Sequence, residues 1–157
     1  MPKFEIYPPK EDSFFLSDFV DKKVKKLHPK KILDMGSGTG ILAKCAIDSG
    51  LDIVNIFVSD INPKSIKILE KDFKNVFLSD LFDKIPKKPK FDLIIFNPPY
   101  LPLDKKEPKS SSLSTTGGKK GSEIINKFLI NAKDYLKKDG EVLLLISSLT
   151  KDVNFSQ

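Results

Sequence analysis

Five short apolar segments alternate with amphipathic segments along this chain, and the alternation constrains the fold more than any other feature. β-Branched and aromatic residues dominate the apolar segments, as is typical of buried strands. We expect strands at 31–35, 53–59, 76–79, 91–96 and 141–147. Apolar residues recur at helical spacing elsewhere, which predicts helices at 11–27, 41–50, 63–73 and 124–136, the last closed by Gly140. Strands that alternate with helices predict an α/β fold, with a mainly parallel sheet and helices on both faces.

The length and composition of the chain fit one domain. Its 157 residues, 39% of them hydrophobic, suffice for a core that needs neither disulfides nor a metal. We expect a single domain over 1–157, made of an N-terminal helical segment at 1–28, an α/β core at 29–157 and, within it, a mobile substrate loop at 101–120. The single cysteine, Cys45, excludes an internal disulfide and a cysteine-rich zinc site. No metal-binding residues are expected.

The net charge of +6 comes almost entirely from lysine. We interpret the lysine clusters as solvated surfaces rather than as an RNA-binding surface, because no aromatic residues interleave with them to stack on bases. Direct binding of nucleic acid is therefore not expected. No apolar stretch is long enough to span a bilayer, and the N-terminus lacks the pattern of a signal peptide. These features indicate a cytoplasmic or nuclear protein without a membrane partner.

Four successive predicted strands each end in a residue of a special type. These residues are Gly36, Asp60, Asp80 and Asn97. In open parallel sheets, ligands bind beyond the carboxyl ends of the strands, at the point where the strand order reverses. The sequence therefore predicts one binding site that all four residues share.

A glycine loop follows the first predicted strand. Gly36, Gly38 and Gly40 follow the spacing G-x-G-x-G, so this is neither the G-x-G-x-x-G of a dinucleotide site nor a P-loop. Glycine lets the backbone turn tightly and approach a ligand closely. The acid just before the loop, Asp34, would repel a phosphate and could bind an ammonium group. A tight strand-to-helix turn without a ligand is the alternative for this loop.

Two further acids complete a description of the ligand. Asp60 can accept hydrogen bonds from the two hydroxyls of a ribose. The alternative is a cap for the helix that begins near Pro63, supplied by Asp60, Asn62 or both. Asp80 can accept from the amine of an adenine while Leu81 packs on the ring, or it can be an ordinary turn residue. Taken together, the three acids predict a ligand with an amino acid end, a ribose and an adenine but no phosphate. S-adenosyl-L-methionine has this composition.

The segment Asn97-Pro98-Pro99-Tyr100 follows the fourth predicted strand. The prolines fix the backbone and remove two donors, so the Asn97 side chain and the Pro98 carbonyl remain as hydrogen-bond acceptors. Both suit a substrate NH2 on a planar group, which needs orientation more than a strong base. Tyr100 could stack on that planar group. A rigid turn without a catalytic role is the alternative.

These motifs resemble those of HemK-type methyltransferases, which modify a glutamine side chain of translation release factors. The resemblance is closest to the short eukaryotic and archaeal branch, and it covers nearly the whole chain. It rests on residues 7–13, the glycine loop, Asp60, Asp80-Leu81, residues 97–100 and residues 117–123. The resemblance implies that Asn97 and Pro98 hold the substrate glutamine. It also implies that the cofactor contacts Ser13, Asp34, Gly36, Asp60, Asp80, Leu81 and Asn97.

The resemblance further implies a Rossmann-like class I methyltransferase fold and a partner. Members of this branch pair with a small zinc-binding activator subunit, which would add a strand at the exposed edge formed here by Val76, Phe77 and Leu78. Three departures from the family pattern stand out. Ser13 replaces the usual threonine, residues 114–116 lack a tryptophan, and the C-terminal strands after the fifth are missing or reduced.

The sequence thus predicts an S-adenosylmethionine-dependent enzyme that methylates a glutamine in a class I release factor. Two other enzymatic activities are alternatives, and the first of them uses the same Asn-Pro-Pro-Tyr chemistry. These are methylation of an exocyclic amine on a DNA or RNA base and methylation of a protein lysine. A non-catalytic binding module is the alternative outside enzymes, and the presence of Asn97 beside a complete set of acids argues against it.

Overall fold

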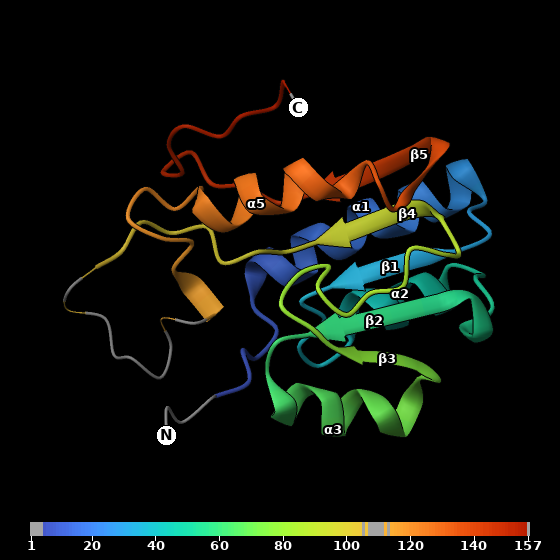
Figure 1. Ribbon diagram of the computed structural model, residues 1–157. Helices are drawn as coiled ribbons and strands as arrows, with labels where there is room; N and C mark the ends of the chain where they lie inside the picture. The colour runs from blue at the N-terminus through green and yellow to red at the C-terminus, as the bar shows by residue number, and fades with distance from the viewer. Residues whose placement is uncertain (1–4, 105, 107–111, 113, 157) are drawn as a thin grey trace.

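A parallel sheet of five strands forms the centre of the protein. The computed structural model describes residues 5–104, 106, 112 and 114–156. The strand order is β3-β2-β1-β4-β5, and all neighbouring pairs are parallel. The strands are β1 (Ile32–Met35), β2 (Ile56–Asp60), β3 (Asn75–Leu78), β4 (Phe91–Phe96) and β5 (Leu136–Leu144). The order reverses between β1 and β4. In Figure 1 the arrowheads point to one side of the molecule, where the segments before α1 and after β4 also lie.

Helices cover both faces of this sheet. They are α1 (Glu11–Leu27), α2 (Ile41–Asp48), α3 (Pro63–Asp72) and α5 (Glu123–Ala132). One buried cluster joins α1, α2 and α3 to the sheet, and a second cluster joins α5 to the opposite face. The predicted α/β fold with a mainly parallel sheet is confirmed. None of the helices in the described part of the chain combines the length and apolarity needed to cross a bilayer.

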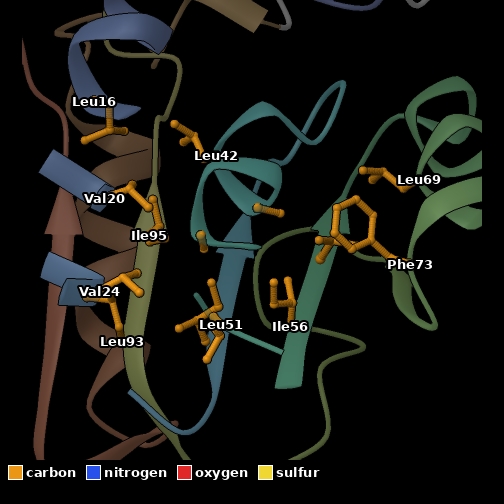
Figure 2. Packing of buried hydrophobic residues seen from close by; sticks show 14 residues of the cluster. Leu16, Val20, Val24, Leu42, Leu51, Ile56, Leu69, Phe73, Leu93 and Ile95 are labelled. Carbon is orange, nitrogen blue, oxygen red and sulfur yellow. The ribbon is translucent and has the colours of Figure 1, made fainter. Parts of the chain in front are cut away.

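The first cluster packs aliphatic side chains of three helices against the central strands. Figure 2 shows Leu16, Val20 and Val24 of α1 beside Leu93 and Ile95 of β4, with α3 contributing from the other end. The second cluster is more aromatic. The ring centroids of Phe82 and Tyr135 lie 4.3 Å apart, and those of Phe96 and Phe128 lie 4.8 Å apart. Strand side chains alternate between these two cores, so each strand end has a fixed orientation.

The segment at 53–59 corrects one predicted boundary. Ile53–Asn55 is a 3₁₀ turn, and the strand begins only at Ile56. The side chain of Asp52 accepts a hydrogen bond from the Val54 N–H at 3.1 Å, which favours a turn over an extended start. The strand still ends at Asp60, so the site residue keeps its predicted place.

The predicted helix at 124–136 is too long, and Gly140 does not close it. Helix α5 ends at Ala132, and the Tyr135 carbonyl accepts a hydrogen bond from the Phe91 N–H at 2.8 Å. Strand β5 therefore starts at Leu136, five residues before its predicted start. Gly140 lies inside β5 at a register shift, where a Cβ would be only 2.8 Å from the Phe91 carbonyl oxygen. Tertiary pairing with β4 overrides the helical pattern here.

The two edges of the sheet are β3 and β5. The prediction that the third strand is peripheral is confirmed. No further strand occurs in residues 145–156, which are described and follow β5.

Candidate active site

A cavity of about 210 Å³ lies at the carboxyl ends of the strands. Segments from the N-terminus, the glycine loop and the ends of β2, β3 and β4 contribute to its wall. Most of the residues predicted for the site share this one wall. They are Ser13, Gly36, Gly38, Asp60, Asp80, Leu81, Asn97, Pro98 and Tyr100. Asp34 and Gly40 are not part of the wall.

The backbone of the glycine loop, at Gly36 and Gly38, forms part of the cavity wall. Gly36, Gly38 and Gly40 have φ values of 65°, 55° and 80°, in the left-handed region where a Cβ is unfavourable. A Cβ on Gly36 would lie 3.3 Å from the Phe96 ring, so the loop passes close to β4. Gly40 precedes α2, and a Cβ there would lie 3.0 Å from atoms of Leu69. Gly40 thus packs into the core rather than into the cavity.

Asp34 lies behind the loop, fully buried in β1 on the same face as Ile32. Neither of its carboxylate oxygens has a hydrogen-bond partner in the described part of the chain. Burial raises the pKa of Asp34 to about 7, and the charge of Asp60 adds to this effect. Because Asp34 does not reach the cavity wall, its predicted contact with an ammonium group stays a prediction.

Asp60 occupies the end of β2 and holds two backbone donors. Its Oδ2 accepts from the Gly38 N–H and its Oδ1 from the Asn62 N–H, both at 2.8 Å. The cap of α3 is Asn62, whose side chain accepts from the Lys64 N–H at 2.9 Å. Each Asp60 oxygen keeps a further lone pair, so the carboxylate can also accept from a diol. Burial raises the pKa of Asp60, and its hydrogen bonds oppose that rise.

Asp80 and Leu81 form a turn after β3. Asp80 is exposed and pairs with the Lys127 ammonium group at 3.1 Å. Leu81 is buried with a φ of 48°, a conformation that is unusual for leucine. The Ser79 hydroxyl donates to the Leu81 carbonyl at 2.8 Å and helps to hold this conformation. The Leu81 side chain thereby presents an apolar surface to the cavity, as an adenine ring would require.

Asn97 contacts Asp12, an acid that was not among the residues predicted for the site. Its Nδ2 donates to Oδ2 of Asp12 at 3.0 Å, while its own Oδ1 is buried without a partner in the described residues. The Tyr100 hydroxyl donates to the same Asp12 oxygen at 3.4 Å, and the Tyr7 hydroxyl donates to the other at 3.3 Å. Asp12 and Tyr7 precede Asn97 by more than 80 residues. The only signal for them was the motif at 7–13.

The cavity is acidic although the chain as a whole is basic. Its wall holds four carboxylates and, among the described residues, no lysine, arginine or histidine. The acids are Glu5, Asp12, Asp60 and Asp80. Such a wall attracts a cation and repels a phosphate. Burial and the charge of Asp12 raise the pKa of Tyr7 to about 12 and also raise that of Tyr100, so both phenols stay protonated near neutral pH.

The fold and the cavity agree with a match over residues 13–153 to the family described as the methyltransferase small domain. The chain belongs to this family. The predictions of a methyltransferase, of its Rossmann-like fold and of S-adenosylmethionine as the cofactor are therefore confirmed.

Relatives in sequence include two proteins with informative names. A putative protein N5-glutamine methyltransferase of Methanocaldococcus jannaschii is 40% identical over 156 residues, covering 93% of this chain and 74% of the relative. The eRF1 methyltransferase catalytic subunit mtq2 of Schizosaccharomyces pombe is 30% identical, covering 87% of this chain and 70% of the relative. The predicted resemblance to the HemK family is confirmed.

Solved structures share the fold of this methyltransferase at low identity. The ribosomal protein L11 methylase of Lactobacillus delbrueckii superposes with a TM-score of 0.59 at 19% identity, covering 87% of this chain and 61% of that one. The methyltransferase PaMTH1 of Podospora anserina, in its SAH-bound form, has a TM-score of 0.53 at 18% identity and covers 82% of this chain and 50% of that one.

Proposed function

We propose that this chain transfers a methyl group from S-adenosylmethionine to the side-chain amide nitrogen of a glutamine in a translation release factor. One observation carries the proposal most directly. Asn97 lines the cavity, and its Oδ1 atom is buried without a hydrogen-bond partner in the described residues, so this oxygen can accept from a donor such as an amide NH2. The names of the two relatives support the same substrate class, because one is a protein N5-glutamine methyltransferase and the other acts on eRF1.

The residues of the cavity fit the cofactor. The wall combines the backbone of the glycine loop with the Asp60 carboxylate. Each oxygen of this carboxylate has a further lone pair that can accept from a ribose hydroxyl. Its negative charge suits a molecule that carries a sulfonium and an ammonium but no phosphate. When bound, S-adenosylmethionine supplies an electrophilic methyl group. In this proposal Ser13, Gly36, Gly38, Asp60, Asp80 and Leu81 hold it.

Asn97 and the Pro98 carbonyl would act on the substrate amide. An amide nitrogen is a poor nucleophile because its lone pair is delocalised. Two acceptors in fixed positions can each take one N–H of the substrate and hold the nitrogen so that its lone pair is aimed at the methyl group. Much of the rate then comes from orientation. The nitrogen need not lose a proton before it attacks, and it releases one proton to water once it carries the methyl group. The acidic wall also disfavours the phosphates of a nucleic-acid substrate.

The test is methyl transfer from labelled cofactor to a purified class I release factor, with the modified residue located by mass spectrometry. We expect one modified glutamine. The Asn97→Ala variant should lose transfer while its affinity for S-adenosylhomocysteine stays within about threefold, since the residue mainly orients the substrate. Label on a lysine, or on an added DNA or RNA oligonucleotide but not on the release factor, would replace the proposed substrate with one of the alternatives.

We also propose that a small zinc-binding activator subunit pairs with the β3 edge to form a heterodimer. Strand β3 bonds to β2 on one side only, and Leu78 at its end is 51% exposed. An exposed apolar edge favours addition of a partner strand. Co-expression with a candidate subunit should give a 1:1 complex by size-exclusion chromatography. Leu78→Glu should weaken it, whereas Ile130→Glu, at a similarly exposed position on α5, should not.

The organisation of the chain follows from the same proposal. We infer that residues 1–157 work as one methyltransferase domain in the cytoplasm, where release factors act. Part of the predicted substrate loop at 101–120 lies outside the described residues. Its described base is closed by hydrogen bonds from the Leu101 N–H to the Thr115 carbonyl and from the Gly117 N–H to the Leu101 carbonyl, at 2.9 and 3.0 Å. Ser114 and Thr115 line the cavity, so this loop would face the substrate.

A further inference from the structure

Asp12 lines the cavity and contacts Asn97, yet the proposed chemistry gives it no role. Three side chains donate to its two oxygens. Tyr7 donates to Oδ1 at 3.3 Å, and Asn97 and Tyr100 donate to Oδ2 at 3.0 and 3.4 Å. The acid is on the first turn of α1, whereas Asn97 and Tyr100 follow β4. The network therefore joins the N-terminal helix to the segment that would hold the substrate.

The contact between Asp12 and Asn97 fixes which end of the carboxamide is paired with the acid and which end is left without a partner. The two ends of an asparagine amide have similar shapes but opposite hydrogen-bonding character, because the oxygen accepts and the nitrogen donates. An ionised carboxylate only accepts, so it selects the Nδ2 end of Asn97. The Oδ1 end is then the one that stays buried without a partner among the described residues.

We propose that Asp12 is a positioning residue that fixes the orientation of the Asn97 amide, so that its oxygen and not its nitrogen meets the substrate. The proposal rests on the proposed function, since the oriented atom matters only for a substrate NH2. With the opposite orientation, Asn97 would present N–H groups to the N–H groups of the substrate. That arrangement would leave donors unpaired in a partly buried site.

The tyrosines keep the carboxylate in place. Burial, followed by the Asp12 charge, raises the pKa of Tyr7 to about 12, and the same causes raise that of Tyr100. Both hydroxyls therefore remain donors across the pH range in which enzymes are assayed. Because Tyr7 occupies the Oδ1 side, the Oδ2 side of Asp12 is held toward Asn97. Locking a functional side chain through its neighbours in this way is a general requirement of precise sites.

The alternative role for Asp12 is to stabilise helix α1 alone. Acids in the first turn of a helix stabilise it by interacting with the helix dipole. Glu11 is also in the first turn of α1, is exposed and lies next to Asp12 in sequence. No hydrogen bond from its side chain to Asn97 or the tyrosines is found among the described residues. Glu11→Gln is therefore a matched control, because it removes one charge from the same helix turn and leaves the network intact.

The orientation can be tested without substrate by NMR of protein labelled with ¹⁵N on asparagine side chains. The Asn97→Ala variant assigns the Asn97 NH2 signal. We expect that signal to move in Asp12→Ala, to move less in Asp12→Asn, and to stay in place in Glu11→Gln. Asp12→Asn keeps the side-chain volume, so it provides the same test where Asp12→Ala does not fold. An Asn97 signal that neither Asp12 variant moves would overturn the proposal.

The kinetic test uses the release factor as substrate. We expect Asp12→Ala to lower kcat by about 10- to 100-fold, with affinity for S-adenosylhomocysteine within about threefold of the unchanged chain. Glu11→Gln should keep its kcat. A full kcat in both Asp12 variants, or an equal loss in Glu11→Gln, would overturn the positioning role alone. An unchanged chain that binds the cofactor product but methylates no release factor would overturn the proposed function, and the positioning proposal with it.

Discussion

Asp34 offers a sharp test of how the core tolerates a charge. The carboxyl group is fully buried and has no hydrogen-bond partner in the described residues. Burial raises its pKa from 3.8 to about 7. The perturbation we choose is Asp34→Asn, which keeps the shape of the side chain but cannot ionise. The measured quantity is the difference in unfolding free energy between the two proteins as a function of pH.

The sign follows from proton binding. Between pH 4 and pH 7 the folded protein holds a proton on Asp34 that the unfolded chain has released, so the native protein loses stability as pH rises through this range. A pKa that is higher by about three units corresponds to about 4 kcal/mol at 1.36 kcal/mol per unit. We therefore expect the unfolding free energy of Asp34→Asn, relative to that of the unchanged chain, to rise by about 4 kcal/mol between pH 4 and pH 8. Burial of the Asn amide itself changes the unfolding free energy of the variant by an amount that does not depend on pH.

Urea unfolding followed by circular dichroism at several pH values provides the measurement. Asp92→Asn is the matched control. Partial burial alone would raise the pKa of Asp92, but hydrogen bonds from the Lys137 ammonium and the Lys31 N–H lower it overall from 3.8. Its contribution to stability is therefore lost only below about pH 4, and the stability difference between Asp92→Asn and the unchanged chain should stay nearly constant from pH 4 to pH 8. If the unfolding free energies of Asp34→Asn and the unchanged chain changed in parallel from pH 4 to pH 8, the pKa of Asp34 would not be raised, because the buried group would then ionise as readily as in the unfolded chain.

Three further predictions concern the cavity and the core. Asp60→Asn should weaken binding of S-adenosylmethionine by about 10- to 100-fold in calorimetry, because the amide keeps only one acceptor oxygen; an unchanged Kd would remove the ribose assignment. Gly36→Ala should lower the unfolding free energy by about 1–2 kcal/mol from its left-handed φ alone, and a Tm equal to that of the unchanged chain would argue against that backbone conformation. Leu69→Ala should lower the unfolding free energy by about 2–5 kcal/mol, measured in urea, because the side chain is fully buried; a loss below about 1 kcal/mol would mean that the core collapses around it.

The architecture was predictable because the strands have a strong local signature. Buried strands of Val, Ile, Leu and Phe followed by glycine or acid specify both the sheet and the edge where a ligand binds. The misplaced boundaries depend on contacts that sequence spacing does not carry. Leu136 belongs to β5 because it pairs with Phe91, which is 45 positions earlier. The turn at Ile53–Asn55 depends on the side chain of Asp52.

The site was predictable where its residues end strands, and it was missed where it depends on distant partners. Asp60 and Asn97 share the cavity as expected, since parallel strands bring their carboxyl ends together. The alternation of side chains along a strand already puts Asp34 on the face of Ile32, away from Met35, which lines the cavity. Asp12 could not be selected in this way, because a helix and a strand end meet there only in the folded chain.

The acidic wall of the cavity has a consequence for turnover. S-adenosylmethionine arrives with a positively charged sulfur, and once the methyl group has left that sulfur is neutral. The carboxylates at positions 5, 12 and 60 therefore favour binding of S-adenosylmethionine over its uncharged-sulfur product, whereas Asp80 is already paired with Lys127. The same charges therefore favour binding of S-adenosylmethionine and release of the product. Added salt should reduce the difference between the affinities for S-adenosylmethionine and for S-adenosylhomocysteine.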